Sequence, residues 1–258
     1  MKTKSLGFIG GGRITKIMLQ VIANNKTEYK AIVVYDINFE ILTALKRQFP
    51  GIQVASSVSE AAQQDMVFLA LHPPVIMDTL ELIKDQVKPI AVVISLAPKI
   101  TIQKIASKLT NVKNIVRLIP NATSIVNEGY NPVCFFTEMS DWKKQTMLSL
   151  FRRMGHTFEV PEDKLESYAI MSAMLPTYFW FQWKELINIG NQIGLTEDES
   201  RNSVRDTMLA ALRTYFYSGL QPDEVIDLIP VKPIGEHEAQ IKAIYNDKLL
   251  QLFAKIKP

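Results

Sequence analysis

Short apolar runs alternate with amphipathic segments over the first half of the chain. The runs are rich in β-branched residues and predict strands at residues 6–9, 31–35, 66–71, 90–96 and 115–118. The segments between them repeat apolar residues at helical spacing and predict helices at residues 14–23, 39–49, 75–83 and 102–109. Strands that are apolar on both faces and alternate with helices form a parallel sheet covered on both sides. Such a sheet binds ligands at the carboxyl ends of its strands.

From about Pro161 the pattern changes to helices alone, predicted at residues 162–192, 197–217, 222–228 and 236–257. The first of these helices carries five aromatic residues in near succession: Tyr178, Phe179, Trp180, Phe181 and Trp183. A helix that is apolar on every side has to be enclosed, and a domain of roughly 100 residues offers limited interior. We therefore predict an α/β protein with a Rossmann-like parallel sheet over residues 1–160 and an all-helical dimerisation domain over residues 161–258.

The strongest candidate for chemistry follows the first predicted strand. Residues 10–15 read Gly-Gly-Gly-Arg-Ile-Thr and fit the pattern G-x-G-x-x-(small). The first glycine allows a tight turn, the second lets the backbone approach a diphosphate, and the small residue packs the helix on the strand. The helix N-terminus adds free N–H groups and a partial positive charge. The alternative is a plain tight turn, with Asp36 as a helix cap.

Asp36 ends the second predicted strand, where an acid binds the ribose hydroxyls of NAD. It would repel the 2′-phosphate of NADP, whereas Asn38 and Arg13 would help to hold that phosphate. The prediction therefore leans slightly to NAD and leaves NADP open. The residues assigned to the cofactor by this motif are Gly10, Gly11, Gly12, Arg13, Ile14, Asp36 and Asn38.

Composition narrows the possible classes. Apolar residues make up 47% and charged residues 21% of the chain, as in globular proteins, and the net charge is only +3. Basic and acidic residues alternate, which gives no case for nucleic acid or an anionic membrane. The most apolar segment, residues 168–187, is too interrupted by polar residues to span a membrane. The single cysteine, Cys134, lies in an apolar run and suits a reducing cytosol. We expect a cytoplasmic protein without a metal site.

Four further stretches, in order along the chain, resemble the pyrroline-5-carboxylate reductase family, which reduces a cyclic imine to proline with NADPH or NADH. Residues 7–14 (GFIGGGRI) are similar to its opening motif, with Arg13 where asparagine is usual. Residues 69–74 (LALHPP) resemble its Ala-Val-Lys-Pro segment, and residues 94–101 (ISLAPKIT) resemble Ser-Ile-Ala-Ala-Gly-Val-Thr. Residues 116–130 (VRLIPNATSIVNEGY) resemble Arg-Val-Met-Pro-Asn-Thr-Pro with its Val-x-x-Gly ending.

The resemblance implies a Rossmann domain followed by a helical domain that dimerises and completes the active site. It also implies that the segment after the third strand lies on the nicotinamide side of the cofactor. The residues that it adds to the cofactor site are Leu71, His72, Pro73 and Ala97.

Two departures from the family lie in the helical domain. Residues 172–178 (Ser-Ala-Met-Leu-Pro-Thr-Tyr) replace Ser-Gly-Ser-Gly-Pro-Ala-Tyr and bring the bulky Met174 and Leu175, and Lys184 stands where the family has a glutamate. The signature Asp-x-Val-x-Ser-Pro-Gly-Gly-Thr-Thr, which supplies donors to the substrate, corresponds to residues 227–238. Both threonines are lost there, and Glu236 and Glu238 bring negative charge. The residues assigned to the substrate are Asn121, Met174, Lys184 and Glu236.

Reduction of an imine needs a proton donor at nitrogen, and a group that titrates near neutral pH suits this task. His237 is the first candidate, and the alternative is a solvated histidine at the start of the last helix. Tyr178 is a second donor or a packing ring, and Ser172 is retained from the family motif. The catalytic candidates are therefore His237, Tyr178 and Ser172.

Three functions follow from these residues. The first is an NAD(P)H-dependent reductase of pyrroline-5-carboxylate or a close analogue, and the second is a reductase of a different imine or oxo substrate on the same scaffold. The third is a non-catalytic NAD(P)-binding dimer that regulates a partner. The intact glycine motif favours the first two, whereas the lost threonines favour the second or third over the first.

Overall fold

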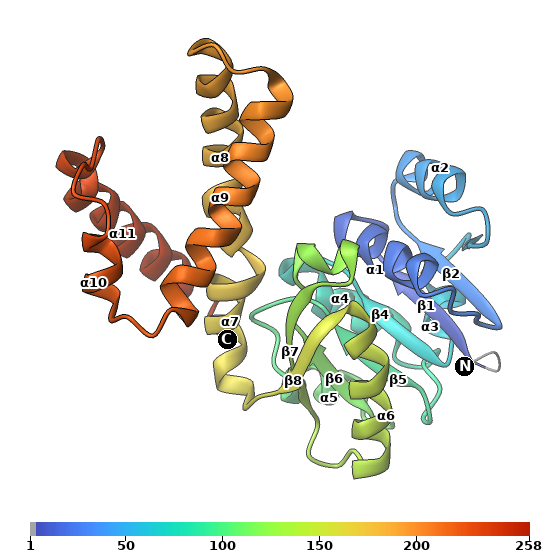
Figure 1. Ribbon diagram of the computed structural model, residues 1–258. Helices are drawn as coiled ribbons and strands as arrows, with labels where there is room; N and C mark the ends of the chain where they lie inside the picture. Colours follow the sequence, from blue (N-terminus) through green and yellow to red (C-terminus); the bar gives the residue numbers. More distant parts are fainter. Residues whose placement is uncertain (1–3) are drawn as a thin grey trace. The chain divides into compact units, whose positions relative to one another are not determined.

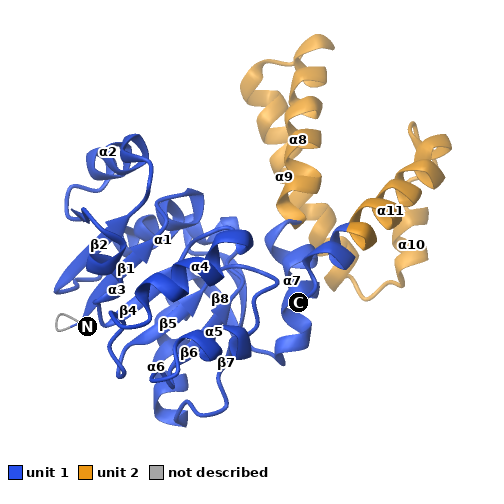
Figure 2. Cartoon of the chain, turned by 180° about the vertical axis from the view of Figure 1, so that it is seen from behind, with its two compact units in different colours: residues 1–174, 252–258 blue, residues 175–251 orange. Residues whose placement is uncertain are grey.

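The computed structural model describes residues 4–258 and divides into two compact units (Figures 1 and 2). One unit comprises the residues up to Met174 together with Leu252–Pro258, and the other comprises Leu175–Gln251. The predicted domain boundary between residues 160 and 161 stays a prediction. Among the described residues, no helix combines the length and apolar content that a membrane span requires.

The first unit is built on an eight-stranded sheet with the order β3-β2-β1-β4-β5-β6-β7-β8 (Figure 1). The strands are β1 (Ser5–Ile9), β2 (Ala31–Tyr35), β3 (Gln53–Val54), β4 (Met66–Leu69), β5 (Val92–Ser95), β6 (Ile115–Leu118), β7 (Gly129–Phe135) and β8 (Gly155–Glu159). All neighbouring strands are parallel except β6 and β7, which are antiparallel. The predicted α/β fold with a mostly parallel sheet is confirmed.

Helices cover both faces of this sheet because successive strand residues point to opposite sides. In β1, Phe8 belongs to one buried cluster and Ile9 to the other. The cluster around Phe8 includes α1 (Arg13–Asn24), α2 (Phe39–Gln48) and α6 (Asp141–Phe151). The cluster around Ile9 includes α3 (Val58–Ala62), α4 (Pro73–Ile83), α5 (Ile102–Lys108) and α7 (Leu165–Tyr168). This double burial explains why the central strands are mostly apolar.

Several elements of the first unit were not predicted: β3, α3, β7, α6 and β8. The strand β7 contains Gly129 and Pro132, which interrupt a strand pattern, and β8 is largely polar. His156 lies in β8, and the centroid of its ring is 5.3 Å from that of Tyr130, on which it stacks. The pattern did not predict β8 because an edge strand does not need an apolar run.

The second unit consists of helices: α8 (Leu175–Gln192), α9 (Glu197–Tyr217), α10 (Pro222–Asp227) and the greater part of α11 (Glu238–Ile256). A reciprocal capping box between Thr196 and Glu199 starts α9. Within residues 175–251, all of which are described, only Gly190 and Ser200 are buried. No large apolar side chain of this unit is buried in the single chain.

Candidate cofactor and substrate sites

The turn after β1 is fixed by the protein itself. Gly10 has a φ of +102°, and a Cβ atom there would lie 2.3 Å from the carbonyl oxygen of Ala70. Its N–H donates to the carbonyl oxygen of Tyr35 at 2.8 Å. The buried hydroxyl of Thr15 donates to the carbonyl oxygen of Gly10 at 2.6 Å. Thr15 therefore closes the turn, which explains a threonine at the small position of the motif.

Gly12 stands at the N-cap of α1, directly after this turn. No side chain caps the helix, and its first turn carries no acidic residue. A Cβ atom at Gly12 would meet no protein atom within 4 Å. The first N–H groups of an α-helix have no partner inside the helix. Here they lie beside open space, which fits the diphosphate of a dinucleotide.

Asp36 follows β2 and joins two backbone segments. Its carboxylate accepts hydrogen bonds from the N–H groups of Gly11 at 2.7 Å and Asn38 at 2.8 Å. The side chain of Asn38 in turn caps α2 by accepting from the N–H of Glu40 at 2.9 Å. Asp36 is thus held beside the glycine turn, and the next side chain, Ile37, is 93% exposed.

A cavity of about 500 Å³ lies at the carboxyl ends of β1, β2 and β4. Five of the predicted cofactor residues line it together: Gly10, Gly12, Asp36, Leu71 and His72. His72 is the N-cap of α4, and Pro73 is the first residue of that helix. Ala97 is buried in the loop after β5, and the side chain of Arg13 is exposed. The sequence motifs thus meet at one edge of the sheet.

The stretch predicted as one helix at residues 162–192 is helical over most of its length but is not one continuous α-helix, because the chain forms a π turn at Ala169–Ala173 before α8 begins. Pro176 has no N–H, so it cannot donate to the carbonyl oxygen of Ser172 as a continuous α-helix requires. That carbonyl instead accepts from the side chain of Asn121 at 2.7 Å. The hydroxyl of Ser172 donates to the carbonyl oxygen of Tyr168 at 2.7 Å.

The side-chain amide of Asn121 both donates and accepts hydrogen bonds within the first unit. Its amide oxygen accepts from the N–H of Thr123 at 2.9 Å and from the hydroxyl of Thr123 at 3.0 Å. The residue is 5% exposed, as is Ser172. Asn121 therefore shapes the turn that carries Ser172, whereas direct contact of either residue with a substrate stays a prediction. Met174 lies just past this turn, at the end of the first unit.

The other predicted catalytic and substrate residues belong to the second unit. The ring of Tyr178 lies 6.2 Å from that of Tyr245, and burial raises the pKa of Tyr178. His237 ends a short 3-10 turn, and its Nε2 lies 3.4 Å from Oε1 of Glu236. Both side chains are largely exposed, as is Lys184. The roles of these residues stay predictions.

Glu238, the first residue of α11, forms an ion pair with Lys242 at 2.5 Å. The hydrogen bond from Lys242 and its positive charge lower the pKa of Glu238. The segment that takes the place of the family's threonines therefore carries an ionised carboxylate at neutral pH.

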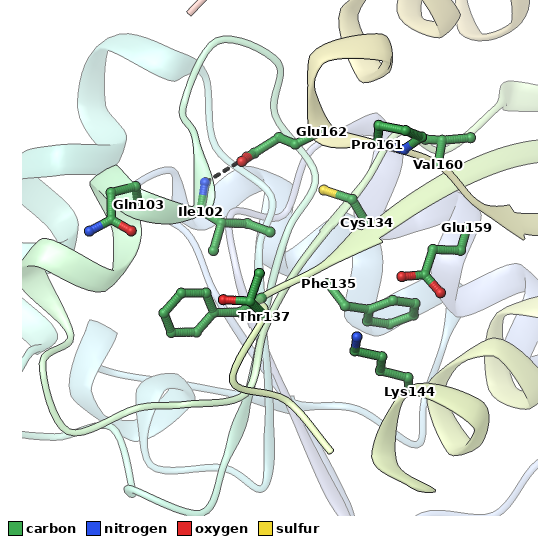
Figure 3. Close-up of a pocket in the computed structure, with 11 residues that line it drawn as sticks. Ile102, Gln103, Cys134, Phe135, Thr137, Lys144, Glu159, Val160, Pro161 and Glu162 are labelled. Carbon is green, nitrogen blue, oxygen red and sulfur yellow. Dashed lines mark hydrogen bonds between the residues drawn. The ribbon is translucent and has the colours of Figure 1, made fainter. Parts of the chain in front are cut away.

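The lone thiol has no catalytic environment. Cys134 is buried and lines a second cavity of about 530 Å³ in the first unit (Figure 3). Burial, and then the negative charge of Glu162, raise the pKa of Cys134 to about 12. The thiolate is the nucleophilic form, and it is scarce at neutral pH. Among residues 4–258, no group of three or more His, Cys, Asp or Glu side chains is arranged to hold a metal ion.

One buried charge cluster was not predicted. Arg117 in β6 is fully buried and pairs with Glu162 and Glu166. The sequence held a signal for it, since an arginine inside an otherwise apolar strand needs a buried acidic partner. The two glutamates come more than 40 residues later, so sequence spacing alone did not identify them.

Comparison with known proteins agrees with this arrangement. Residues 5–99 match the sequence model of the family described as NADP oxidoreductase, coenzyme F420-dependent. Pyrroline-5-carboxylate reductase 1 of Bacillus spizizenii is 25% identical over 244 residues, which are 93% of this chain and 82% of that protein. The structure of a pyrroline-5-carboxylate reductase from Coxiella burnetii is 27% identical, with a TM-score of 0.69 over 99% of this chain and 95% of that one.

The crystal structure of Plasmodium falciparum pyrroline carboxylate reductase, with NADP bound, has a TM-score of 0.76 at 22% identity. It covers 99% of this chain and 95% of that chain, so the fold is shared throughout. The resemblance seen in the motifs is confirmed over nearly the full length, as distant homology to pyrroline-5-carboxylate reductases.

Proposed function

We propose that this protein is an NAD(P)H-dependent reductase of a cyclic imine, acting on pyrroline-5-carboxylate or a close analogue. The observation that carries the proposal is the glycine turn, where Gly12 leaves open space at the N-terminus of α1. Pyrroline-5-carboxylate reductases of Bacillus spizizenii and Escherichia coli align over most of the chain. A bound nicotinamide dinucleotide supplies the hydride in such a reaction.

The chain's own residues divide the task of holding this cofactor. In the proposal, the backbone N–H groups of Gly12, Arg13 and Ile14 hold the diphosphate, and Gly10 and Gly11 shape the turn that presents them. Asp36 accepts hydrogen bonds from a ribose. Leu71, His72, Pro73 and Ala97 provide the nicotinamide side. We further propose a preference for NADH, because the carboxylate of Asp36 repels a 2′-phosphate. The exposed Ile37 beside it offers that phosphate no hydrogen bond.

Residues of the second unit and of the turn before it are assigned to proton donation and to the substrate. We assign proton donation to His237 or Tyr178, because both carry a proton that a substrate nitrogen can accept. Ser172, Asn121, Met174, Lys184 and Glu236 are assigned to shaping the substrate site or contacting the substrate.

The test is to follow oxidation of NADH and NADPH with pyrroline-5-carboxylate as substrate. Cyclic imines without a carboxylate, cyclic imines with an added amine, and 2-oxo acids are assayed beside it. We expect turnover of pyrroline-5-carboxylate, faster with NADH at low cofactor concentration. Tight cofactor binding without turnover of pyrroline-5-carboxylate contradicts the proposed substrate, and absence of turnover with every compound contradicts the proposed reaction.

A reductase of a different imine is the second candidate, and the acidic segment at Glu236–Glu238 favours it. The ionised Glu238 and the exposed Glu236 stand where the family offers neutral donors to a substrate carboxylate. Carboxylates in such a place disfavour an anionic substrate and favour a cationic one. Faster turnover of an amine-bearing imine than of pyrroline-5-carboxylate would support this candidate.

We also propose that a second copy of the chain covers the helices of the second unit. This unit buries no large apolar side chain in the single chain, and Trp180 and Phe181 are 44% and 66% exposed. Replacing Phe181 with lysine should convert the dimer to a monomer at micromolar concentration, because a charge then has to be desolvated at the interface. Sedimentation equilibrium measures the change.

Trp142 provides the matched control for this prediction. It is 75% exposed, lies on α6 of the first unit and is also aromatic. Trp142→Lys should leave the oligomeric state unchanged. A monomeric wild-type protein, or equal dissociation by both variants, would exclude the proposed interface.

A further inference from the structure

We propose that Arg117, Glu162 and Glu166 form a positioning cluster that holds the loop between β5 and α5 in the shape needed on the nicotinamide side. This inference rests on the proposed reductase function for its catalytic consequence. None of the three residues is assigned contact with the substrate or the cofactor. They act through the backbone of residues 96–102, which includes Ala97.

The cluster begins with an arginine in the centre of the sheet. Arg117 lies in β6 between β5 and β7, and its side chain is 0% exposed. Its Nη1 donates to Oε1 of Glu162 at 2.9 Å, and its Nη2 donates to Oε1 of Glu166 at 2.5 Å. The side chain of Glu166 is 1% exposed. The guanidinium thus fixes two carboxylates, one of them fully removed from water.

Both carboxylates also accept hydrogen bonds from the loop. Oε1 of Glu166 accepts from the N–H of Lys99 at 3.0 Å. Oε1 of Glu162 accepts from the N–H of Ile102 at 2.7 Å, and Figure 3 shows this carboxylate reaching the backbone nitrogen. Each glutamate therefore joins Arg117 to the backbone, Glu166 at Lys99 in the loop and Glu162 at Ile102, the first residue of α5. Charge-assisted hydrogen bonds of this kind are stronger than neutral ones.

The loop has a conformation that needs such support. Lys99 has a φ of +75°, in the left-handed region that residues with a Cβ atom rarely adopt. Residues in strained conformations persist where their surroundings hold them. The hydrogen bond from Lys99 to the buried Glu166 supplies that restraint directly at the strained residue.

The use of buried ion pairs at this place also indicates that the cluster positions the loop and does not mainly stabilise the fold. Burying ions is costly, and a buried ion pair is often no more stabilising than apolar residues of the same volume. Apolar residues, however, would leave the N–H groups of Lys99 and Ile102 without these acceptors. What the charges add is two fixed acceptors, one within the irregular loop and one where α5 begins.

The same cluster reaches the turn that carries Ser172. Glu166 lies in α7, which continues directly into the π turn at Ala169–Ala173. Arg117 lies in β6, which leads to Asn121, and Asn121 binds the carbonyl of Ser172. The cluster of Arg117, Glu162 and Glu166 therefore contacts the loop that contains Ala97. It also includes residues of β6 and α7, the two elements that lead to Asn121 and Ser172.

Glu166→Gln tests the proposal, because it keeps the shape of the side chain and removes its charge. We expect hydrogen exchange at the Lys99 amide to accelerate by about tenfold, because the amide oxygen of glutamine accepts a weaker hydrogen bond than the charged carboxylate does. With the substrate that the wild-type enzyme reduces fastest, the kcat of Glu166→Gln should be about tenfold lower than that of the wild type. Its KM for NADH should differ by less than about threefold. Cofactor affinity comes mainly from the distant diphosphate and ribose contacts.

Asp65→Asn is the matched control. Asp65 also accepts from a backbone N–H, that of Ser5 at 2.9 Å, and pairs with Lys88 at 3.3 Å. It lies at the amino ends of β1 and β4, away from the ligand edge of the sheet. This variant should leave kcat and exchange at Lys99 unchanged. An equal fall of kcat in both variants would mean general destabilisation and would overturn the proposal.

Glu162→Gln is the second variant to test if Glu166→Gln does not fold, since the side chain of Glu162 is 32% exposed. It should accelerate hydrogen exchange at the Ile102 amide.

If the wild-type protein turns over no substrate, the proposed reductase function is wrong, but the role of the cluster can still be tested. Exchange at Lys99 then reports on the loop, and the emission of bound NADH reports on the nicotinamide side. Unchanged exchange or unchanged emission in the glutamine variant would overturn the inference.

Discussion

Replacing Gly12 with alanine is expected to abolish tight dinucleotide binding while leaving the fold intact. The new methyl group would meet no protein atom within 4 Å, and the φ of −69° at Gly12 suits alanine. It would, however, fill the space at the N-terminus of α1 that a diphosphate needs. We expect the dissociation constant for NADH to rise by at least about 100-fold, or about 3 kcal/mol. Titration of nicotinamide fluorescence measures this change.

Thermal unfolding separates the two effects of this substitution. The stability of the free protein should change by less than about 1 kcal/mol, because only an N-cap preference is altered. Gly51→Ala is the matched control, since a Cβ atom at that exposed turn also meets no protein atom within 4 Å. It should affect neither stability nor binding. Unchanged NADH affinity in Gly12→Ala would remove the glycine turn from the site.

Replacing Asp36 with asparagine is expected to shift cofactor choice toward NADPH. The carboxylate that repels a 2′-phosphate is lost, and two like charges at about 4 Å cost about 1–4 kcal/mol between water and a protein surface. The ratio of dissociation constants, NADPH over NADH, should therefore fall by at least about tenfold. Affinity for NADH itself should weaken modestly, because one of the bonds to Gly11 and Asn38 is lost. Parallel titrations with both reduced cofactors give the ratio.

Glu40→Gln controls for charge in general. Glu40 lies in the first turn of α2, near Asp36 in the chain, and its side chain is exposed. Its removal should leave the ratio unchanged. If both variants shift the ratio equally, the effect is one of net charge and Asp36 has no selective role.

The candidate cofactor site at the carboxyl ends of β1 and β2 could be predicted from the sequence, because the residues that form it follow one another closely in the chain. A strand, three glycines and a helix follow one another, and Asp36 directly follows the next strand, so chain order alone brings them to one edge of the sheet. The structure adds the reason for Thr15, whose hydroxyl closes the turn. That hydrogen bond depends on backbone geometry that a pattern of residue types does not contain.

Other features depended on partners distant in the chain. The break at Ala169–Ala173 follows from the missing N–H of Pro176 and from Asn121, which is far earlier in the sequence. Helical spacing through residues 162–192 concealed it. The pairing of β7 with β8 also escaped prediction, because these strands carry a proline and polar residues and obtain their order from the sheet. Long-range hydrogen bonds overrode local preference in both cases.

The closed turn at Gly10 also bears on the thermodynamics of cofactor exchange. Tyr35 and Thr15 hold this backbone through hydrogen bonds that involve no ligand. A loop that is ordered in advance does not lose conformational entropy when a nucleotide arrives. Oxidised and reduced cofactor would therefore exchange at a turn whose backbone is already ordered. The binding free energy would not be reduced by the entropy cost of ordering that backbone.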